Sequence, residues 1–74
     1  MKVEWREIDC NYYCAKPTRH FILTAREIAD GHACTVHYRG SRIHLKYTKT
    51  LASAQQSAAR ALQRLVEDVR GIEQ

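Results

Sequence analysis

The chain has 74 residues, with 45% hydrophobic and 27% charged side chains, and a net charge of +4 from 12 Lys and Arg against 8 Asp and Glu. These values are typical of one globular domain, and they exclude a disordered chain and a membrane span of ~20 apolar residues. A chain this short builds little more core than one sheet covered by one helix, which argues against an enclosed active site and so against an enzyme. The positive charge favours an anionic partner, either nucleic acid or an acidic protein surface.

The N-terminal segment, residues 1–15, allows two interpretations. Residues 3–8 can form an edge strand, residues 9–11 a turn, and residues 12–15 a segment that pairs back. The same stretch also has apolar residues at helical spacing, at Trp5, Ile8, Tyr12 and Ala15. The β-forming residues at the start and the Asp-Cys-Asn turn favour the strand.

The middle of the chain predicts a meander of three antiparallel strands. Residues 20–27, 32–39 and 42–47 alternate apolar and polar side chains, as half-buried strands do. Turn residues separate them at 30–31 and 39–41, and the second turn contains a glycine that can adopt positive φ. The apolar face of the meander would consist of Phe21, Leu23, Ala25, Cys34, Val36, Tyr38, Ile43, Leu45 and Tyr47.

Residues 51–70 predict an amphipathic helix. Thr50 is a favourable N-cap, and Gly71 is a favourable residue just after the last turn. Small and apolar residues form one stripe along this helix, in which we expect Leu62 and Leu65 to be almost fully buried. The stripe comprises Leu51, Ala54, Ala58, Ala61, Leu62, Leu65 and Val69.

These elements predict a single α+β domain over residues 1–74. Its fold class is an antiparallel meander sheet of three to four strands packed on one C-terminal amphipathic helix. The strands are expected at about residues 3–8, 20–27, 32–39 and 42–47, and the helix at about residues 51–70.

If the apolar strand face meets the helix, alternation places the other side chains on the outer face of the sheet. That face would consist of His20, Ile22, Thr24, Arg26, Ala33, Thr35, His37, Arg39, Arg42, His44 and Lys46. It would be basic, with no acidic residue and no exposed aromatic ring to stack on bases. One interpretation is a hydrated face without a partner. The other is a binding surface for phosphates or an acidic protein, formed by Arg26, His37, Arg39, Arg42, His44, Lys46 and Lys49.

The odd number of cysteines argues against a disulfide framework. Cys10, Cys14 and Cys34 occur in a chain whose N-terminus has no apolar signal core, so we expect reduced thiols and a cytoplasmic location. Cys34 falls in the apolar row of its strand, where a free thiol behaves as a small hydrophobic group. Cys10 and Cys14 fit the first ligand pair of a structural zinc site loosely, but His32-x-Cys34 does not resemble the second pair, and nothing places a base beside a cysteine. We therefore expect no metal, no cofactor and no catalytic residue.

The stretch from Tyr47 to Leu62 contains the cadence Ala-x-x-x-Ala-Ala-x-Ala-Leu, in a helix that follows a three-stranded meander. It resembles the C-terminal part of double-stranded-RNA-binding domains. Basic residues at the opening of the helix bind phosphates in that family, a role that the resemblance implies for Lys46 and Lys49. The lysine pair that the family has inside the first turns is replaced here by alanine, serine and glutamine.

The whole chain is also similar to short accessory proteins of phages and prophages, including anti-CRISPR proteins. The resemblance consists of Trp5-Arg6-Glu7-Ile8, Tyr13-x-Ala15, a hairpin, and Thr50-Leu51-Ala52-Ser53-Ala54 at the start of the alanine-rich helix. It implies a protein of the bacterial cytoplasm that acts on defence or nucleic-acid-handling machinery.

Together these features predict a small non-enzymatic binding module whose basic sheet face binds nucleic acid. The alternative is a protein-targeted inhibitor of a bacterial defence or nucleic-acid-handling complex. Neither interpretation requires a cofactor or a membrane, and the sequence leaves the oligomeric state open.

Overall fold

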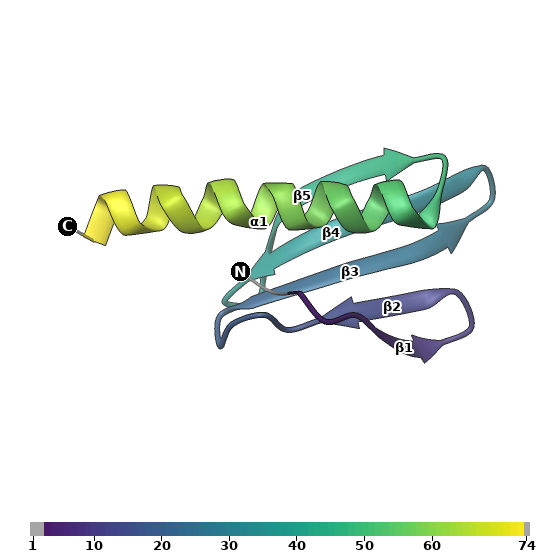
Figure 1. Ribbon diagram of the computed structural model, residues 1–74, viewed down its shortest axis with the longest axis horizontal. Helices are drawn as coiled ribbons and strands as arrows, with labels where there is room; N and C mark the ends of the chain where they lie inside the picture. Colours follow the sequence, from purple (N-terminus) through teal and green to yellow (C-terminus); the bar gives the residue numbers. More distant parts are fainter. Residues whose placement is uncertain (1–2, 74) are drawn as a thin grey trace.

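The computed structural model describes residues 3–73, and the side chains of residues 3–68. Five antiparallel strands form one sheet in chain order, and a single helix lies across one of its faces (Figure 1). The elements are β1 (Arg6–Asp9), β2 (Tyr12–Ala15), β3 (Phe21–Ile28), β4 (Gly31–Tyr38), β5 (Ser41–Thr48) and α1 (Leu51–Glu73). The predicted α+β meander is confirmed, with five strands in place of three to four.

The N-terminal segment forms a β-hairpin, so the helical interpretation is wrong. β1 begins at Arg6, later than expected, because Val3 and Trp5 pack against the core instead of pairing with a strand. Glu7 lies opposite Tyr13 across the hairpin. A hydrogen bond between these two side chains raises the pKa of Tyr13, since the carboxylate accepts from the neutral phenol.

The core lies between the helix and the three central strands. Its buried members are Ala15, Phe21, Leu23, Ala25, Cys34, Val36, Ala54, Ala58 and Leu62, of which Phe21 is the one aromatic residue. Cys34 is 0% exposed, as its place in the apolar row predicts. Alanines at positions 54 and 58 let the helix backbone approach β3 and β4 closely, so the core closes with mostly small and medium-sized side chains.

The start of α1 follows the prediction and its end does not. The Thr50 hydroxyl accepts a hydrogen bond of 3.1 Å from the Ser53 amide, which confirms the N-cap. The helix then continues through Gly71 to Glu73, so the expected termination at Gly71 is wrong. The 23 residues of α1 span about 34 Å, whereas the eight of a central strand span about 27 Å. α1 therefore extends past the strands, as Figure 1 shows.

This overhang explains the different burial of the two leucines expected in the core. Leu62 is 1% exposed and lies over the sheet. Leu65 is only half-buried, because it lies one turn further toward the overhanging end, and the prediction of near-complete burial is wrong for it. Val66, outside the predicted stripe, also packs against the core. The side chain of Val69 lies outside the described residues.

From His44 onward, the side chains of β5 point to the faces opposite to those predicted. Arg39 and Gly40 both have positive φ, 50° and 86°, as a two-residue type I′ turn requires. Next to the turn the strands pair in the simple register, with His37 opposite Arg42, but His44 then lies opposite Val36. Ile43 is thus an extra, bulged residue.

A bulge of one residue exchanges the two faces of the strand beyond it. His44 and Lys46 therefore lie on the helix side, opposite Val36 and Cys34. Leu45 and Tyr47, which were predicted to join the core, face away from the helix and are 40% and 65% exposed, and the bulged Ile43 is 42% exposed. The physical reason is that α1 approaches β3 and β4 most closely, so apolar side chains on the helix side of the edge strand would meet the polar flank of the helix instead of the core.

Leu62→Ala should lower the free energy of unfolding by about 2–5 kcal/mol, because the substitution leaves a cavity where the helix covers the sheet completely. Leu65→Ala, which removes the same atoms from a half-buried position, is the matched control and should cost clearly less. Urea denaturation followed by circular dichroism measures both values. Equal losses for the two variants would contradict the packing described above.

Gly31→Ala should destabilise the fold more than Gly40→Ala. Both glycines have positive φ, 153° and 86°, but a Cβ at Gly31 would lie 2.5 Å from the Thr48 carbonyl oxygen, whereas a Cβ at Gly40 meets nothing within 4 Å. Strained backbone positions cost on the order of 1–3 kcal/mol, and the contact with Thr48 adds to this at Gly31. Thermal unfolding of both variants tests the order, and a more stable Gly31→Ala would refute it.

Candidate functional site

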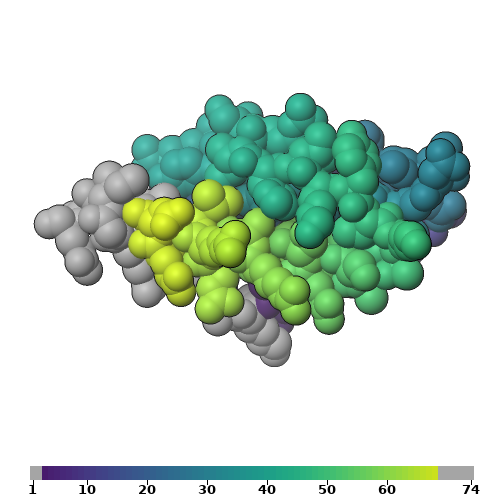
Figure 2. Space-filling view, turned by 90° about the horizontal axis from the view of Figure 1, so that it is seen from above, coloured from purple at the N-terminus to yellow at the C-terminus, as the bar shows by residue number. Residues whose placement is uncertain are grey.

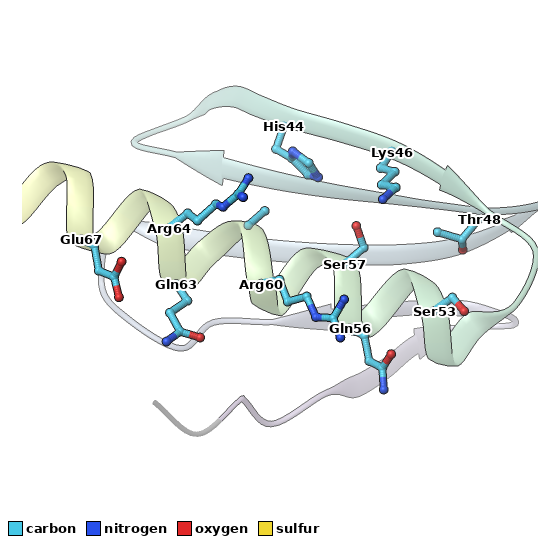
Figure 3. A pocket seen from close by; sticks show the side chains of 11 residues that line it. His44, Lys46, Thr48, Ser53, Gln56, Ser57, Arg60, Gln63, Arg64 and Glu67 are labelled. Atoms are coloured by element: carbon cyan, nitrogen blue, oxygen red, sulfur yellow. The ribbon is translucent and has the colours of Figure 1, made fainter.

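A groove runs along the molecule between β5 and the polar flank of α1. Figure 2 shows the strand and the helix side by side on this face, and Figure 3 shows the side chains that line the hollow. Its volume is about 690 Å³. The lining residues are His44, Lys46 and Thr48 from β5, and Ser53, Gln56, Ser57, Arg60, Ala61, Gln63, Arg64 and Glu67 from α1.

Two sequence periods create this groove. On β5, every second residue after the bulge lies on the helix side, which brings His44, Lys46 and Thr48 into one row. On α1, the residues at positions 53, 57, 60 and 64 recur at spacings of four, three and four, so they form a second row beside the alanine stripe. The two rows face each other because the buried alanines, Ala54 and Ala58, hold the helix against β3 and β4.

The groove is basic. Lys46, Arg60 and Arg64 contribute permanent positive charges, and Glu67 is the one acidic residue among those that line the groove. In Figure 3 the Arg64 side chain extends from the helix toward the strand that carries His44. The Nε2 atom of His44 is shielded from solvent and has no hydrogen-bond partner, so the imidazole adds an unused polar group to this side of the groove. The arrangement attracts an anion and offers it several donors.

The residues predicted to form one basic surface are divided between two faces. Arg26, His37 and Arg42 lie on the outer face of the sheet, as expected, because each pairs with an outward-facing neighbour. His44 and Lys46 lie in the groove on the opposite side, so the prediction of a single basic sheet face is wrong. Arg39 lies in the turn, where its guanidinium covers the Tyr38 ring at 5.4 Å, and Lys49 lies in the exposed connection to α1.

The outer face differs from the prediction in its aromatic content as well. The register aligns Tyr12, Arg26, Ala33 and Tyr47 in one row across the sheet. Tyr47 is 65% exposed, so the expectation of a face without exposed aromatic rings is wrong. The same face carries a second row in which the Thr24 and Thr35 hydroxyls are hydrogen-bonded between neighbouring strands. Cations, tyrosines and aliphatic side chains are thus mixed there.

Arg60 and Arg64 were not among the predicted binding residues. Their spacing of four places them on one side of a helix, and the same helical period directs them away from the apolar stripe. The sequence does not show which flank of the helix lies next to β5, and the choice between a groove and open solvent depends on that. The tertiary structure alone brings these arginines to Lys46.

A second hollow of about 560 Å³ lies on the outer face beside the N-terminal hairpin. Its lining is Glu4, Arg6, Ile8, Cys14, Lys16 and Pro17, a mixture of both charges and apolar groups. Among the described residues no group of three or more His, Cys, Asp or Glu side chains is arranged to hold a metal ion. This hollow therefore has less charge bias than the basic groove.

Comparisons with known proteins assign no family. The chain matches no protein-family model, no curated protein and no solved structure. In the part of the chain that the structure describes, no helix is both long enough and apolar enough to cross a membrane. The chemistry of the two faces is therefore the basis for a functional assignment.

The three thiols should react with a cysteine reagent in the order of their exposure. Cys10 is exposed, Cys14 is half-buried and Cys34 is buried, so Cys10 should be labelled first and Cys34 only when the protein opens. Labelling with Ellman's reagent, with mass spectrometry to assign each site, measures the three rates. Loss of the fast phase in Cys10→Ser is the control, and fast labelling of Cys34 in the folded protein would contradict its place in the core.

Proposed function

We propose that this protein is a non-enzymatic module that binds nucleic acid through the basic groove between β5 and α1. The observation that supports the proposal is the concentration of Lys46, Arg60 and Arg64 in one hollow with a single acidic residue, Glu67, in its lining. Clefts lined by charge of one sign raise the local concentration of ligands of the opposite sign. A polyanion is the ligand that matches a row of cations along a strand and a helix.

The groove has the two kinds of group that phosphate binding uses. Arginine side chains donate two parallel hydrogen bonds to phosphate oxygens, and lysine contributes a mobile point charge. Hydroxyl and amide side chains in the same lining donate to phosphates and sugars, and these are Thr48, Ser53, Gln56, Ser57 and Gln63. Such contacts position a nucleic acid without reading its sequence, so we expect weak sequence preference and strong dependence on salt.

The alternative function uses the same cations. An inhibitor that docks on an acidic protein surface, such as a phage-derived inhibitor of a bacterial defence complex, would also place its partner against a basic groove. The two functions differ in their ligand, because a protein surface presents scattered carboxylates whereas nucleic acid presents phosphates at regular spacing. Binding to a duplex or single strand of arbitrary sequence therefore discriminates between them.

The groove and the outer face offer a matched pair of variants. Lys46→Gln with Arg64→Gln removes two charges from the groove, whereas Arg26→Gln with Arg42→Gln removes two from the outer face. Each lost phosphate contact lowers the slope of log K against log salt by about 0.9 for duplex DNA, so the groove variant should lose affinity and about 1.8 units of slope. The outer-face variant should lose little of either, although its net charge is the same.

Gel shift and fluorescence anisotropy over a range of salt concentrations measure both quantities. Circular dichroism of the two variants checks that both remain folded, which we expect because all four side chains are exposed. Equal losses in the two variants would show that only net charge matters and would contradict a groove site. No binding to any duplex or single strand at ~150 mM salt and high micromolar protein would eliminate nucleic acid and favour the protein-targeted inhibitor.

A further inference from the structure

The β5 strand forms a long free edge of the sheet. It is last in the strand order and has eight residues, of which 44–48 follow its bulge without a further break, whereas the opposite edge, β1, has four residues and contains a bulge of its own. A long edge strand presents a row of unpaired N–H and C=O groups that can pair with another strand. The helix lies over one face of the sheet, so it does not cover this edge (Figure 1).

Three exposed side chains of β5 that follow Arg42 are apolar and lie at intervals of two residues about a middle residue, Leu45. Ile43, Leu45 and Tyr47 are 42%, 40% and 65% exposed. In an antiparallel pair of two β5 strands centred on Leu45, Leu45 lies opposite Leu45 of the second copy and Ile43 lies opposite Tyr47. Both of these opposed pairs are then apolar. An interface with two-fold symmetry requires such self-complementarity.

We propose that the protein binds a second copy of itself by antiparallel pairing of the two β5 strands about Leu45, and that this pairing joins the two basic grooves into one channel. Opposed apolar pairs across antiparallel strands stabilise the pairing beyond the backbone hydrogen bonds. A second copy supplies this match by symmetry, whereas an unrelated partner would need an exposed apolar strand of its own.

The pairing places both helices on the same face of one continuous sheet. Directly opposed residues of antiparallel strands point to the same side, so the two-fold axis is perpendicular to the sheet. On the helix side, His44 lies opposite Lys46 of the second copy, and Arg60 and Arg64 of each copy lie behind them. The two helices form the walls of the channel. This second half of the inference rests on the proposed function, because the channel is a site only for a polyanion.

The two faces of the paired β5 strands affect the pairing in opposite ways. Apolar contacts on the outer face favour pairing, whereas the cations that meet across the channel oppose it. Raising the salt concentration screens this repulsion, so self-association should strengthen with salt. Nucleic-acid binding weakens with salt, because salt opposes the release of counterions. A polyanion at low salt should restore pairing, since it binds the dimer more tightly than the monomer.

A cysteine at position 45 tests the pairing directly. In directly opposed residues the Cα atoms lie about 4.5–5.5 Å apart, which is within the range of a disulfide. The variant Leu45→Cys, in a Cys10→Ser and Cys14→Ser background that leaves only the buried Cys34, should form a covalent dimer under mild oxidation. The control is Tyr47→Cys in the same background, because that position is more exposed but would lie about 13 Å from its symmetry mate.

We expect Leu45→Cys to cross-link at least about tenfold faster than Tyr47→Cys, because only the former brings two sulfur atoms within bonding reach. A mixture of Ile43→Cys and Tyr47→Cys should form the mixed dimer faster than either variant forms its own. These reactions contain no nucleic acid, so they test the pairing even if the proposed function is wrong. Equal rates for Leu45→Cys and Tyr47→Cys would mean random collision and would overturn the proposal.

The joined channel has a separate test. Leu45→Glu places a charge at the centre of the seam and leaves every lining residue of the groove in place. It should remain monomeric in sedimentation at all salt concentrations, and its affinity for a duplex should fall at least about tenfold if two grooves act together, because bivalent contact raises overall affinity. Unchanged affinity of a folded Leu45→Glu variant would overturn the channel. Loss of binding in the groove variant alone would leave the proposed function standing.

Discussion

The position of one bulged residue in β5 determines the surface of this protein. Next to the turn the strands pair in the simple register, and the insertion of Ile43 then reverses which side chains face the helix. Without the bulge, Ile43 and Leu45 would lie opposite Val36 and Cys34 and would extend the core. With it, the groove receives His44 and Lys46. A local irregularity of the backbone thus separates the apolar and the basic side chains of one strand onto opposite faces.

The close contact between the helix and the central strands makes this exchange possible. Ala54 and Ala58 are fully buried against β3 and β4, and Leu62 closes the core above them. Because the helix backbone lies near the middle of the sheet, its polar flank reaches over β5 instead of solvent. The strand β5 then has the polar flank of α1 over one face and no element over its other face. Such a strand gains little by turning aliphatic residues inward.

The consequence for stability is that three large apolar residues of β5 stay exposed, in a small domain with a limited number of such residues. A chain of this size buries only about 60% of its unfolded surface, so each exposed leucine or isoleucine is a substantial fraction of the apolar area available. Exposed apolar patches that are rimmed by polar or charged residues often mark interaction sites. The cost in folding free energy is therefore consistent with a surface used for association, with the basic groove on the other side of the same strand.

From the sequence one could predict the three-stranded meander and its turns, the capped helix and the burial of Phe21, Cys34 and Leu62, because these depend on local periodicity and on residues with strong conformational preferences. The tertiary structure alone decided the orientation of β5, the incomplete burial of Leu65 and the grouping of Lys46 with Arg60 and Arg64. A period of two in a strand is unchanged by a shift of one residue, except that every side chain moves to the other face. Both orientations of β5 therefore satisfy the same sequence pattern, and only the position of the helix over the sheet distinguishes them.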